Sequence, residues 1–217
     1  MTTPAKNSLR TAVTLLAFTV LGTGLLAYTF DITKDAIANS EEETKQTLIN
    51  QALPPTLYDN TILNDVAIIP PTPELGTTRP TTAYRARLNG APAALVLEAI
   101  APDGYSGKIT LLIAIRANGE LAGVRVVSHK ETPGLGDYIE AAKSDWIKQF
   151  NHASLVQPDS SAWKVKKDGG NFDYLSGVTI TPRAVIKAVH KALRYYEQHG
   201  SEIFARPSYS TSTPSPS

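Results

Sequence analysis

Hydrophobic residues first occur as one unbroken run near the N-terminus. Residues 11–30 contain no charged side chain and are rich in Leu, Val, Ala and Phe. A helix of about 20 residues rises roughly 30 Å, which is the thickness of the hydrocarbon core of a bilayer. The pattern therefore predicts a transmembrane helix. A cleaved signal peptide is the alternative, but this run exceeds a signal core of about 7 to 15 residues, and charges separate it from the cleavage-like Ala36-Ile37-Ala38.

The pattern then changes to shorter segments. Ser40–Glu43 have the form of a capping box, they lead into residues 44–53, and Pro54-Pro55 stops the helix. Residues 70–80 hold several prolines and little apolar periodicity, which is typical of an extended connector. Residues 31–80 are thus predicted to form a membrane-proximal helix and a proline-rich connector.

Strand-like runs follow, and Asn-Gly pairs separate them. Asn89-Gly90 lies between residues 82–88 and 93–100, and Asn118-Gly119 lies between residues 108–116 and 121–128. Asn-Gly tolerates the positive φ angles of type I′ turns, so both pairs predict β-hairpins. An antiparallel sheet is the expected result.

Two later segments have helical periodicity. Residues 137–150 place apolar side chains approximately on one side, and residues 182–199 are clearly amphipathic, with Gly200 as a C-terminal stop. The apolar stripe of the second helix consists of Val185, Ala188, Val189, Ala192, Leu193 and Tyr196. The predicted class is α+β, with an antiparallel sheet flanked by helices in one domain, residues 81–206. Residues 207–217, almost all Ser, Thr and Pro, are predicted to be a disordered tail.

Charge and composition exclude several classes of function. The formal net charge is only +1, so the chain lacks the basic face that nucleic acid requires. It has no cysteine, which removes disulfides, thiolate metal sites and iron–sulfur ligation. No histidine spacing indicates a metal site, and no Gly-rich nucleotide loop is present. Any redox role therefore needs an organic cofactor or haem, and no catalytic or metal-binding residue is predicted.

Charges that flank the apolar run predict its orientation. Lys6 and Arg10 precede it, whereas Asp31 and Asp35 follow it with only Lys34. By the positive-inside rule, residues 1–10 are expected in the cytoplasm and the main domain in the periplasm.

The candidate site is the run from Asp173 to Arg183, which ends a loop and opens a helix. Thr181 is a plausible N-cap and Pro182 suits the first helical position. Unpaired N–H groups at such a terminus attract anions, which favours a phosphate group without identifying its owner. A capped helix after a glycine turn is the alternative.

Residues 173–179 also resemble the Asp-x-x-(Ser/Thr)-Gly-Ala-Thr pattern at which a flavin transferase attaches FMN through a phosphoester to the final threonine. That threonine is Thr179 here, and Val178 stands where the family usually has Ala. Residues 129–137 resemble a second stretch of the same proteins, His-x-Glu-Thr-Pro-Gly-Leu-Gly. With the N-terminal anchor and similarity from about residue 97 to residue 192, the chain resembles the G subunits of Rnf (Rsx) electron transport complexes.

The resemblance implies a function and a location. Such a chain is a single-pass inner-membrane subunit that holds one covalent FMN on the periplasmic side. Its complex couples electron transfer between ferredoxin and NAD to ion movement. Its partners are membrane lipid, the other subunits (A, B, C, D and E) and, during maturation, the flavin transferase. Whether the isolated chain is an enzyme stays open.

The resemblance and the local chemistry together select further residues. Asp173 is the position that the family pattern associates with transferase recognition. Ser176 and Thr181 are candidate hydroxyl donors to the phosphate, and Gly177 lets the backbone pass close to it. Near the flavin ring, the candidates are Glu131, Thr132, Gly134 and Leu135. His129 and Glu131 allow a relay or a loop anchor, and the anchor is favoured.

Two alternatives remain at this stage. The C subunit of the sodium-pumping NADH:quinone oxidoreductase shares both motifs, although the shorter chain and Ser128-His129-Lys130 favour the Rnf assignment. A non-redox periplasmic binding or scaffold module, whose Ser-Gly-Val-Thr turn is merely a helix cap, belongs to a different class.

Overall fold

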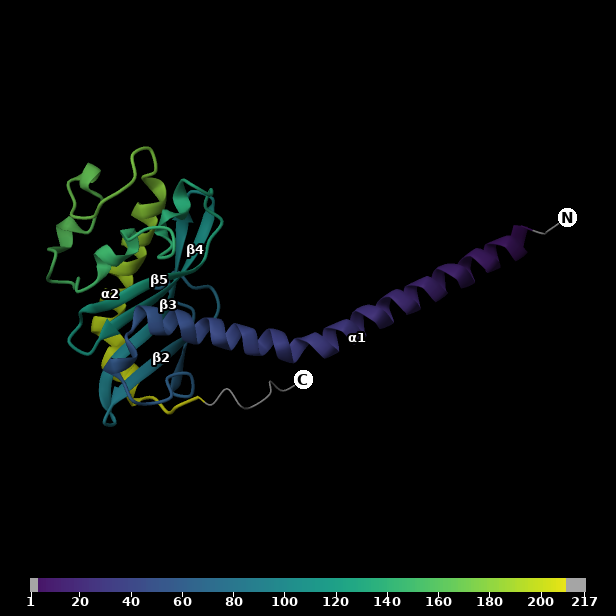
Figure 1. The fold of residues 1–217 in the computed structure, drawn as a ribbon, viewed down its shortest axis with the longest axis horizontal. Coiled ribbons are helices and arrows are strands. Elements are labelled where there is room, and N and C mark those ends of the chain that lie inside the picture. The colour runs from purple at the N-terminus through teal and green to yellow at the C-terminus, as the bar shows by residue number, and fades with distance from the viewer. Residues whose placement is uncertain (1–3, 210–217) are drawn as a thin grey trace. The chain divides into compact units, whose positions relative to one another are not determined.

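The structure is a computed structural model that describes residues 4–209, without the side chains of residues 4–7, 35–39 and 41–42. The chain divides into two compact units, residues 1–45 and residues 46–217. Helix α1 (Pro4–Ala52) supplies the first unit and the beginning of the second (Figure 1).

Helix α1 contains the predicted membrane span. The segment Ser8–Lys34 is long and apolar enough to cross a bilayer. Its large apolar side chains are exposed, as for Phe18 at 71% and Leu26 at 73%. Apolar surface on this scale needs a covering such as lipid.

Residues 44–52 are helical as predicted, but they do not form a separate helix that begins at the capping box. Helix α1 runs unbroken through residues 40–43, and the Ser40 carbonyl accepts a hydrogen bond from Thr44 Oγ1. Residues 31–52 contain neither glycine nor proline, so nothing interrupts the backbone ladder. The helix ends at Ala52, before Pro54, as the prolines predicted.

The sheet is an antiparallel meander with the strand order β1-β2-β3-β4-β5 (Figure 1). The strands are β1 (Val66–Ile69), β2 (Thr81–Leu88), β3 (Ala91–Gly104), β4 (Gly107–Arg116) and β5 (Leu121–Ser128). Strands β2 to β5 are the four that the sequence predicted. Strand β1, with a short 3-10 segment at Pro55–Leu57 before it, lies within residues 31–80, where only a helix and a connector were expected.

The connections between strands differ from one another. Asn89 and Gly90 both have positive φ, 52° and 77°, which fits the predicted type I′ turn. At Asn118-Gly119 only the glycine does (φ 86°), and its N–H donates to the Arg116 carbonyl. The second turn is therefore a longer hairpin loop, and the type I′ prediction was wrong there. The hairpin from Gly104 to Gly107 was not predicted.

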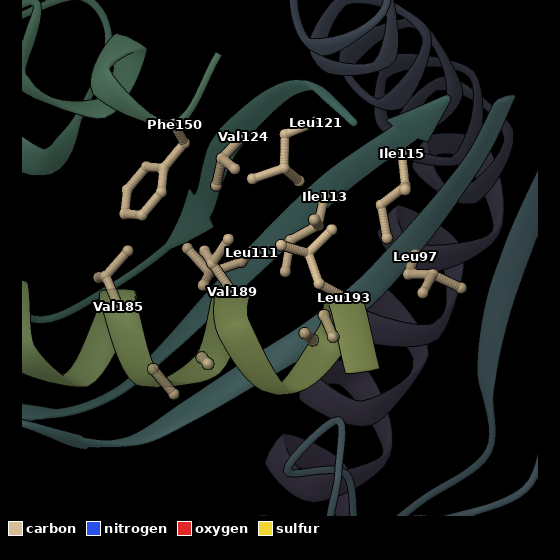
Figure 2. Packing of buried hydrophobic residues seen from close by; sticks show 14 of the residues in the cluster. Leu97, Leu111, Ile113, Ile115, Leu121, Val124, Phe150, Val185, Val189 and Leu193 are labelled. Atoms are coloured by element: carbon tan, nitrogen blue, oxygen red, sulfur yellow. The ribbon is translucent and has the colours of Figure 1, made fainter. Parts of the chain in front are cut away.

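Helix α2 (Ile180–Ala205) covers one face of the sheet through contacts with β3 and β4. Figure 2 shows Val185, Val189 and Leu193 of α2 against the side chains of Leu111 and Ile113. The predicted apolar stripe is buried, with Tyr196 partly so. Because β3 and β4 are covered on both faces, the middle of each strand is mostly apolar, whereas charged residues such as Asp103 and Lys108 lie near the ends.

Gly200 does not end α2, which contradicts the predicted stop. The helix continues to Ala205, and a Cβ on the buried Gly200 would lie 2.9 Å from the Tyr196 ring. The absence of a side chain at this position thus serves packing inside the helix. The end of α2 is held instead by Arg85 of β2, which donates to the carbonyls of Ile203 and Arg206.

The other face of the sheet is covered by the end of α1. Ile49, Ala52 and Leu53 form a second buried cluster with sheet residues such as Val96 and Leu112. At Gly123 of β5, a Cβ would lie 2.5 Å from the Ala52 carbonyl oxygen, so this glycine permits the close approach of α1.

Residues 137–150 do not form the predicted α-helix. They form two 3-10 segments, Gly136–Ile139 and Trp146–Phe150, because Glu140 is extended and the Ser144 hydroxyl donates to the Tyr138 carbonyl. Two more 3-10 segments follow at Ser160–Ala162 and Lys166–Asp168. Of the predicted apolar positions, Ile139, Trp146 and Phe150 are nevertheless buried, whereas Ala142 is exposed.

The beginning of the predicted disordered tail is hydrogen-bonded. The Ser208 hydroxyl donates to the Asn64 carbonyl, and the Tyr209 N–H donates to the Val66 carbonyl at 2.9 Å. Residues 207–209 therefore continue the chain along β1, which differs from the expectation. The rest of the predicted tail, residues 210–217, lies outside the described residues.

Candidate functional site

Two tight turns stand near the start of α2. In the turn Thr132–Leu135, Gly134 has φ 76° and the Leu135 N–H donates to the Thr132 carbonyl at 3.1 Å. In the turn Leu175–Val178, Gly177 has φ 84° and the Val178 N–H donates to the Leu175 carbonyl at 2.9 Å. Positive φ at the third residue is the requirement of a type II turn, and Pro133 suits its second position. Both predicted glycines thus have a turn role.

The Glu131 carboxylate joins these segments. Its Oε1 accepts from the Ser106 N–H at 3.0 Å, and its Oε2 accepts from the Thr181 hydroxyl at 2.6 Å. The residue is only 5% exposed. A Cβ on Gly136 would lie 2.6 Å from Oε2, so a glycine there makes room for the carboxylate. Glu131 therefore ties the β3–β4 turn and the start of α2 to the loop after β5.

Thr181 is not the N-cap of α2, so that prediction was wrong. The N-cap is Thr179, Thr181 is the second residue of the helix, and Pro182 is the third rather than the first. Thr181 is fully buried and its hydroxyl donates to Glu131. This geometry gives Thr181 a positioning role toward Glu131.

Thr179 is the N-cap residue of α2, but its hydroxyl does not cap the helix. Its side chain makes no capping hydrogen bond, and its Oγ1 accepts from Arg183 NH1 at 3.2 Å. Arg183 is itself held by Asp168, with Nε and NH2 donating to the two carboxylate oxygens at 2.6 and 2.7 Å. This pairing lowers the pKa of Asp168 and raises the pKa of Arg183. A fixed cation therefore lies next to the Thr179 hydroxyl.

A pocket of about 290 Å³ opens beside Thr179. It is lined by Tyr105, Glu131, Thr132, Leu135, Gly136, Gly177, Val178, Thr179, Ile180 and Thr181. Most of the predicted site residues are thus brought together. Gly136 was expected beside the ring as part of the segment 132–136, whereas Tyr105 and Ile180 were not predicted. The hairpin that carries Tyr105 has no Asn-Gly signal.

Gly134, Asp173 and Ser176 do not line this pocket. The backbone of Asp173 is fixed, since its N–H donates to Gln149 Oε1 at 2.7 Å and its carbonyl accepts from the Trp146 indole at 2.6 Å. Its carboxylate is exposed and pairs with Lys166 at 2.5 Å. Ser176 is exposed at the second position of its turn.

A larger cavity of about 420 Å³ lies beside β5, and none of the residues predicted to contact the flavin or its phosphate lines it. His129 lines it, accepts the Glu131 N–H on Nδ1 at 2.9 Å, and pairs its Nε2 with Glu140 Oε1 at 2.6 Å. His129 thus anchors the loop, as favoured from the sequence. Within residues that the structure describes, no group of three His, Cys, Asp or Glu side chains is placed to hold a metal ion.

The domain that contains this pocket matches a flavin-binding class. The family described as the FMN-binding domain matches residues 104–194, which include every residue of the pocket. The family described as the RnfG N-terminal region matches residues 1–52, which end at the last residue of α1.

Curated relatives extend the match over most of the chain. In Pseudomonas aeruginosa, the protein named as the G subunit of the ion-translocating oxidoreductase complex is 47% identical, over 92% of this chain and 94% of the relative. The protein with this name in Shewanella oneidensis is 42% identical, over 92% and 94%. That of Vibrio atlanticus is 41% identical, over 91% and 94%. The chain belongs to the family of G subunits of ion-translocating oxidoreductase complexes.

Proposed function

We propose that this chain relays electrons within an ion-translocating membrane complex through an FMN that is esterified to Thr179 by its phosphate. The observation that carries the proposal is the state of the Thr179 hydroxyl. It lies at a pocket, is not used as a helix cap, and has a guanidinium at 3.2 Å. A structural threonine at an N-cap would normally spend its hydroxyl on a backbone N–H.

The residues around Thr179 fit the two ends of FMN. Arg183 offers a cation where the phosphate would begin, and Tyr105, Leu135, Val178 and Ile180 give the pocket apolar side chains. The volume of about 290 Å³ is at the lower end of small-molecule sites, which range from about 300 to 1,000 Å³. This small volume supports a flavin ring that packs one side against the pocket and leaves the other side exposed to solvent. FMN supplies reversible electron transfer that the side chains of this chain do not provide.

The remaining parts of the proposal rest on the family and on the sequence. The names of the relatives support a place among the other subunits, A to E, of a complex, and the proposal extends to the family's electron route between ferredoxin and NAD. The charges around α1 support a cytoplasmic N-terminus and a periplasmic domain. The exposed Asp173 carboxylate supports recognition by a flavin transferase during maturation.

Coexpression of the full chain with a flavin transferase tests the covalent attachment. We expect flavin absorbance that survives acid precipitation and washing of the protein. Thr179→Val should remove this absorbance, and Thr179→Ser should restore part of it because it restores a hydroxyl. Thr78→Val, which alters an exposed threonine outside the pocket, is the matched control and should keep the flavin.

A contrary result is equally clear. If the wild-type chain carries no acid-stable flavin while a known substrate of the same transferase is labelled in parallel, covalent attachment is wrong. The non-redox binding or scaffold module then becomes the better account of the fold.

A further inference from the structure

Arg183 ends the run 173–183, and the sequence motifs give its side chain no role. It lies in α2 one turn after Thr179, and its NH1 donates to Thr179 Oγ1 at 3.2 Å. We infer that Arg183 binds the phosphate of the incoming flavin at Thr179 and keeps the finished phosphodiester paired. This inference rests on the proposed attachment at Thr179 and adds the group that makes this hydroxyl a good acceptor.

The orientation of Arg183 is built into the fold. Nε and NH2 are both used by Asp168, at 2.6 and 2.7 Å, which leaves NH1 directed to Thr179. Asp168 belongs to the 3-10 segment Lys166–Asp168, and its N–H donates to the Val165 carbonyl at 2.8 Å. A bidentate carboxylate fixes the plane of a guanidinium, so the third nitrogen is aimed rather than free.

The charges around Thr179 suit this role for Arg183, and Lys164 and Lys167 add further positive charge near Asp168. No acidic residue stands in the first turn of α2, so an anion there meets no carboxylate from the helix itself. Two neighbouring lysines already have partners, since Lys166 pairs with Asp173 at 2.5 Å and Lys187 pairs with Asp103 at 2.8 Å. Arg183 also has a partner, but its fork retains a donor for a second anion.

The chemistry of transfer needs such a donor. In the step, Thr179 Oγ1 forms a bond to the flavin-side phosphorus of a flavin dinucleotide. The bond from that phosphorus to the oxygen that bridges the two phosphates breaks. The other half of the dinucleotide departs as a nucleoside monophosphate and keeps the electron pair. A base of the transferase takes the hydroxyl proton. The guanidinium of Arg183 only donates hydrogen bonds, so it does not accept the proton of the Thr179 hydroxyl. Its charge offsets the negative charge that accumulates on the phosphoryl oxygens.

A purely structural role is the competing explanation. The Asp168–Arg183 pair also links the 3-10 segment to α2. If the pair has only this structural role, its loss affects labelling only because the turn before Thr179 becomes less ordered. The two roles differ in their response to lysine. Arg183→Lys retains a cation but loses the bidentate geometry, whereas Arg183→Gln loses the charge.

The test measures the initial rate of labelling of the purified full-length chain by a flavin transferase with a flavin dinucleotide. We expect Arg183→Gln to slow labelling by about tenfold or more, since a cation that offsets the charge on a reacting phosphate has a large effect on rate. Arg183→Lys and Asp168→Asn should stay within about threefold of the wild-type rate, because both retain the cation. Thermal unfolding of each variant checks that the domain is folded.

The outcomes separate the two proposals. Wild-type rates in Arg183→Gln would overturn the inference and leave attachment at Thr179 intact. Equal slowing in Arg183→Gln, Arg183→Lys and Asp168→Asn would show that the pair acts only as a structural link, which also overturns it. An unlabelled wild-type chain, or a label that maps away from Thr179, would overturn the proposed function itself.

Discussion

Glu131 Oε2 accepts a hydrogen bond from Thr181 Oγ1 at 2.6 Å, across 50 positions of the sequence. Both side chains are buried, and the other oxygen of Glu131 accepts from the Ser106 N–H. One carboxylate thus links three segments that the pocket needs. It also explains why the second motif and the proposed attachment motif belong to one site.

Thr181→Val tests this link. Valine has nearly the same shape but cannot donate, so it leaves a buried carboxylate oxygen without its hydroxyl partner. We expect the free energy of unfolding to fall by about 1 to 3 kcal/mol, measured by urea denaturation. Thr132→Val, an exposed neighbour in the same pocket, should change it by less than about 0.5 kcal/mol. Equal stability of the wild-type chain and Thr181→Val would show that the hydrogen bond does not hold the site together.

Gly177→Ala tests the turn before Thr179. Gly177 has φ 84°, a region that is costly for a residue with a Cβ, although no atom blocks a Cβ there. We expect a loss of about 1 to 2 kcal/mol in stability and slower flavin labelling of Thr179. Ser176→Ala, at the exposed neighbouring position, is the control and should leave stability unchanged. An unaffected Gly177→Ala protein would mean that the turn adapts freely.

Arg85→Met tests how the end of α2 is held. Arg85 is 1% exposed, pairs with Asp65 at 2.6 Å, and donates to the Ile203 and Arg206 carbonyls. Methionine fills similar space but leaves these partly buried acceptors without the guanidinium, so we expect a loss of about 3 kcal/mol. The comparison is Arg79→Met at an exposed position. Native-state hydrogen exchange should show early opening of residues 200–205, and protection like that of the wild type would contradict this.

Stability should fall in acid, in part through Asp65. Burial raises the pKa of Asp65, but the hydrogen bond from Arg87 and the charge of Arg85 outweigh it, so the pKa lies below its ordinary value. A carboxyl of this kind contributes stability above its unfolded pKa of about 3.9, and the contribution is lost as the pH falls through the folded pKa. Urea denaturation as a function of pH should show a decline below about pH 4 that is shallower in Asp65→Asn. An identical slope would remove Asp65 from this account.

Local patterns predicted the parts of the fold that depend on local physics. The strands β2 to β5 have strong apolar character, and the stripe on α2 has clear helical spacing, so both were predicted from periodicity. The short strand β1 and the 3-10 segments after Gly136 were missed because tertiary partners decide them. Residues 139, 146 and 150 are buried as expected, but Ser144 and the extended Glu140 replace the helix between them.

The sequence predicted most residues of the candidate site but not the contacts between them. Motifs named Thr179 and Glu131, but they do not reveal that Thr181 donates to Glu131 rather than capping the helix. Tyr105 lies in no motif and lines the pocket from a distant hairpin. Arg183 ends the run 173–183, but only its ion pair with Asp168 and its contact with Thr179 show a role for its side chain. Only a folded structure shows such contacts.

Tandem mass spectrometry of the protein purified from its own host membrane tests the central claim most directly. The account predicts that the peptide containing Thr179 carries the added mass of FMN, with fragment ions that place it on Thr179 rather than on Ser176 or Thr181. An unmodified Thr179 in protein from cells that contain the assembled complex and an active transferase would contradict it.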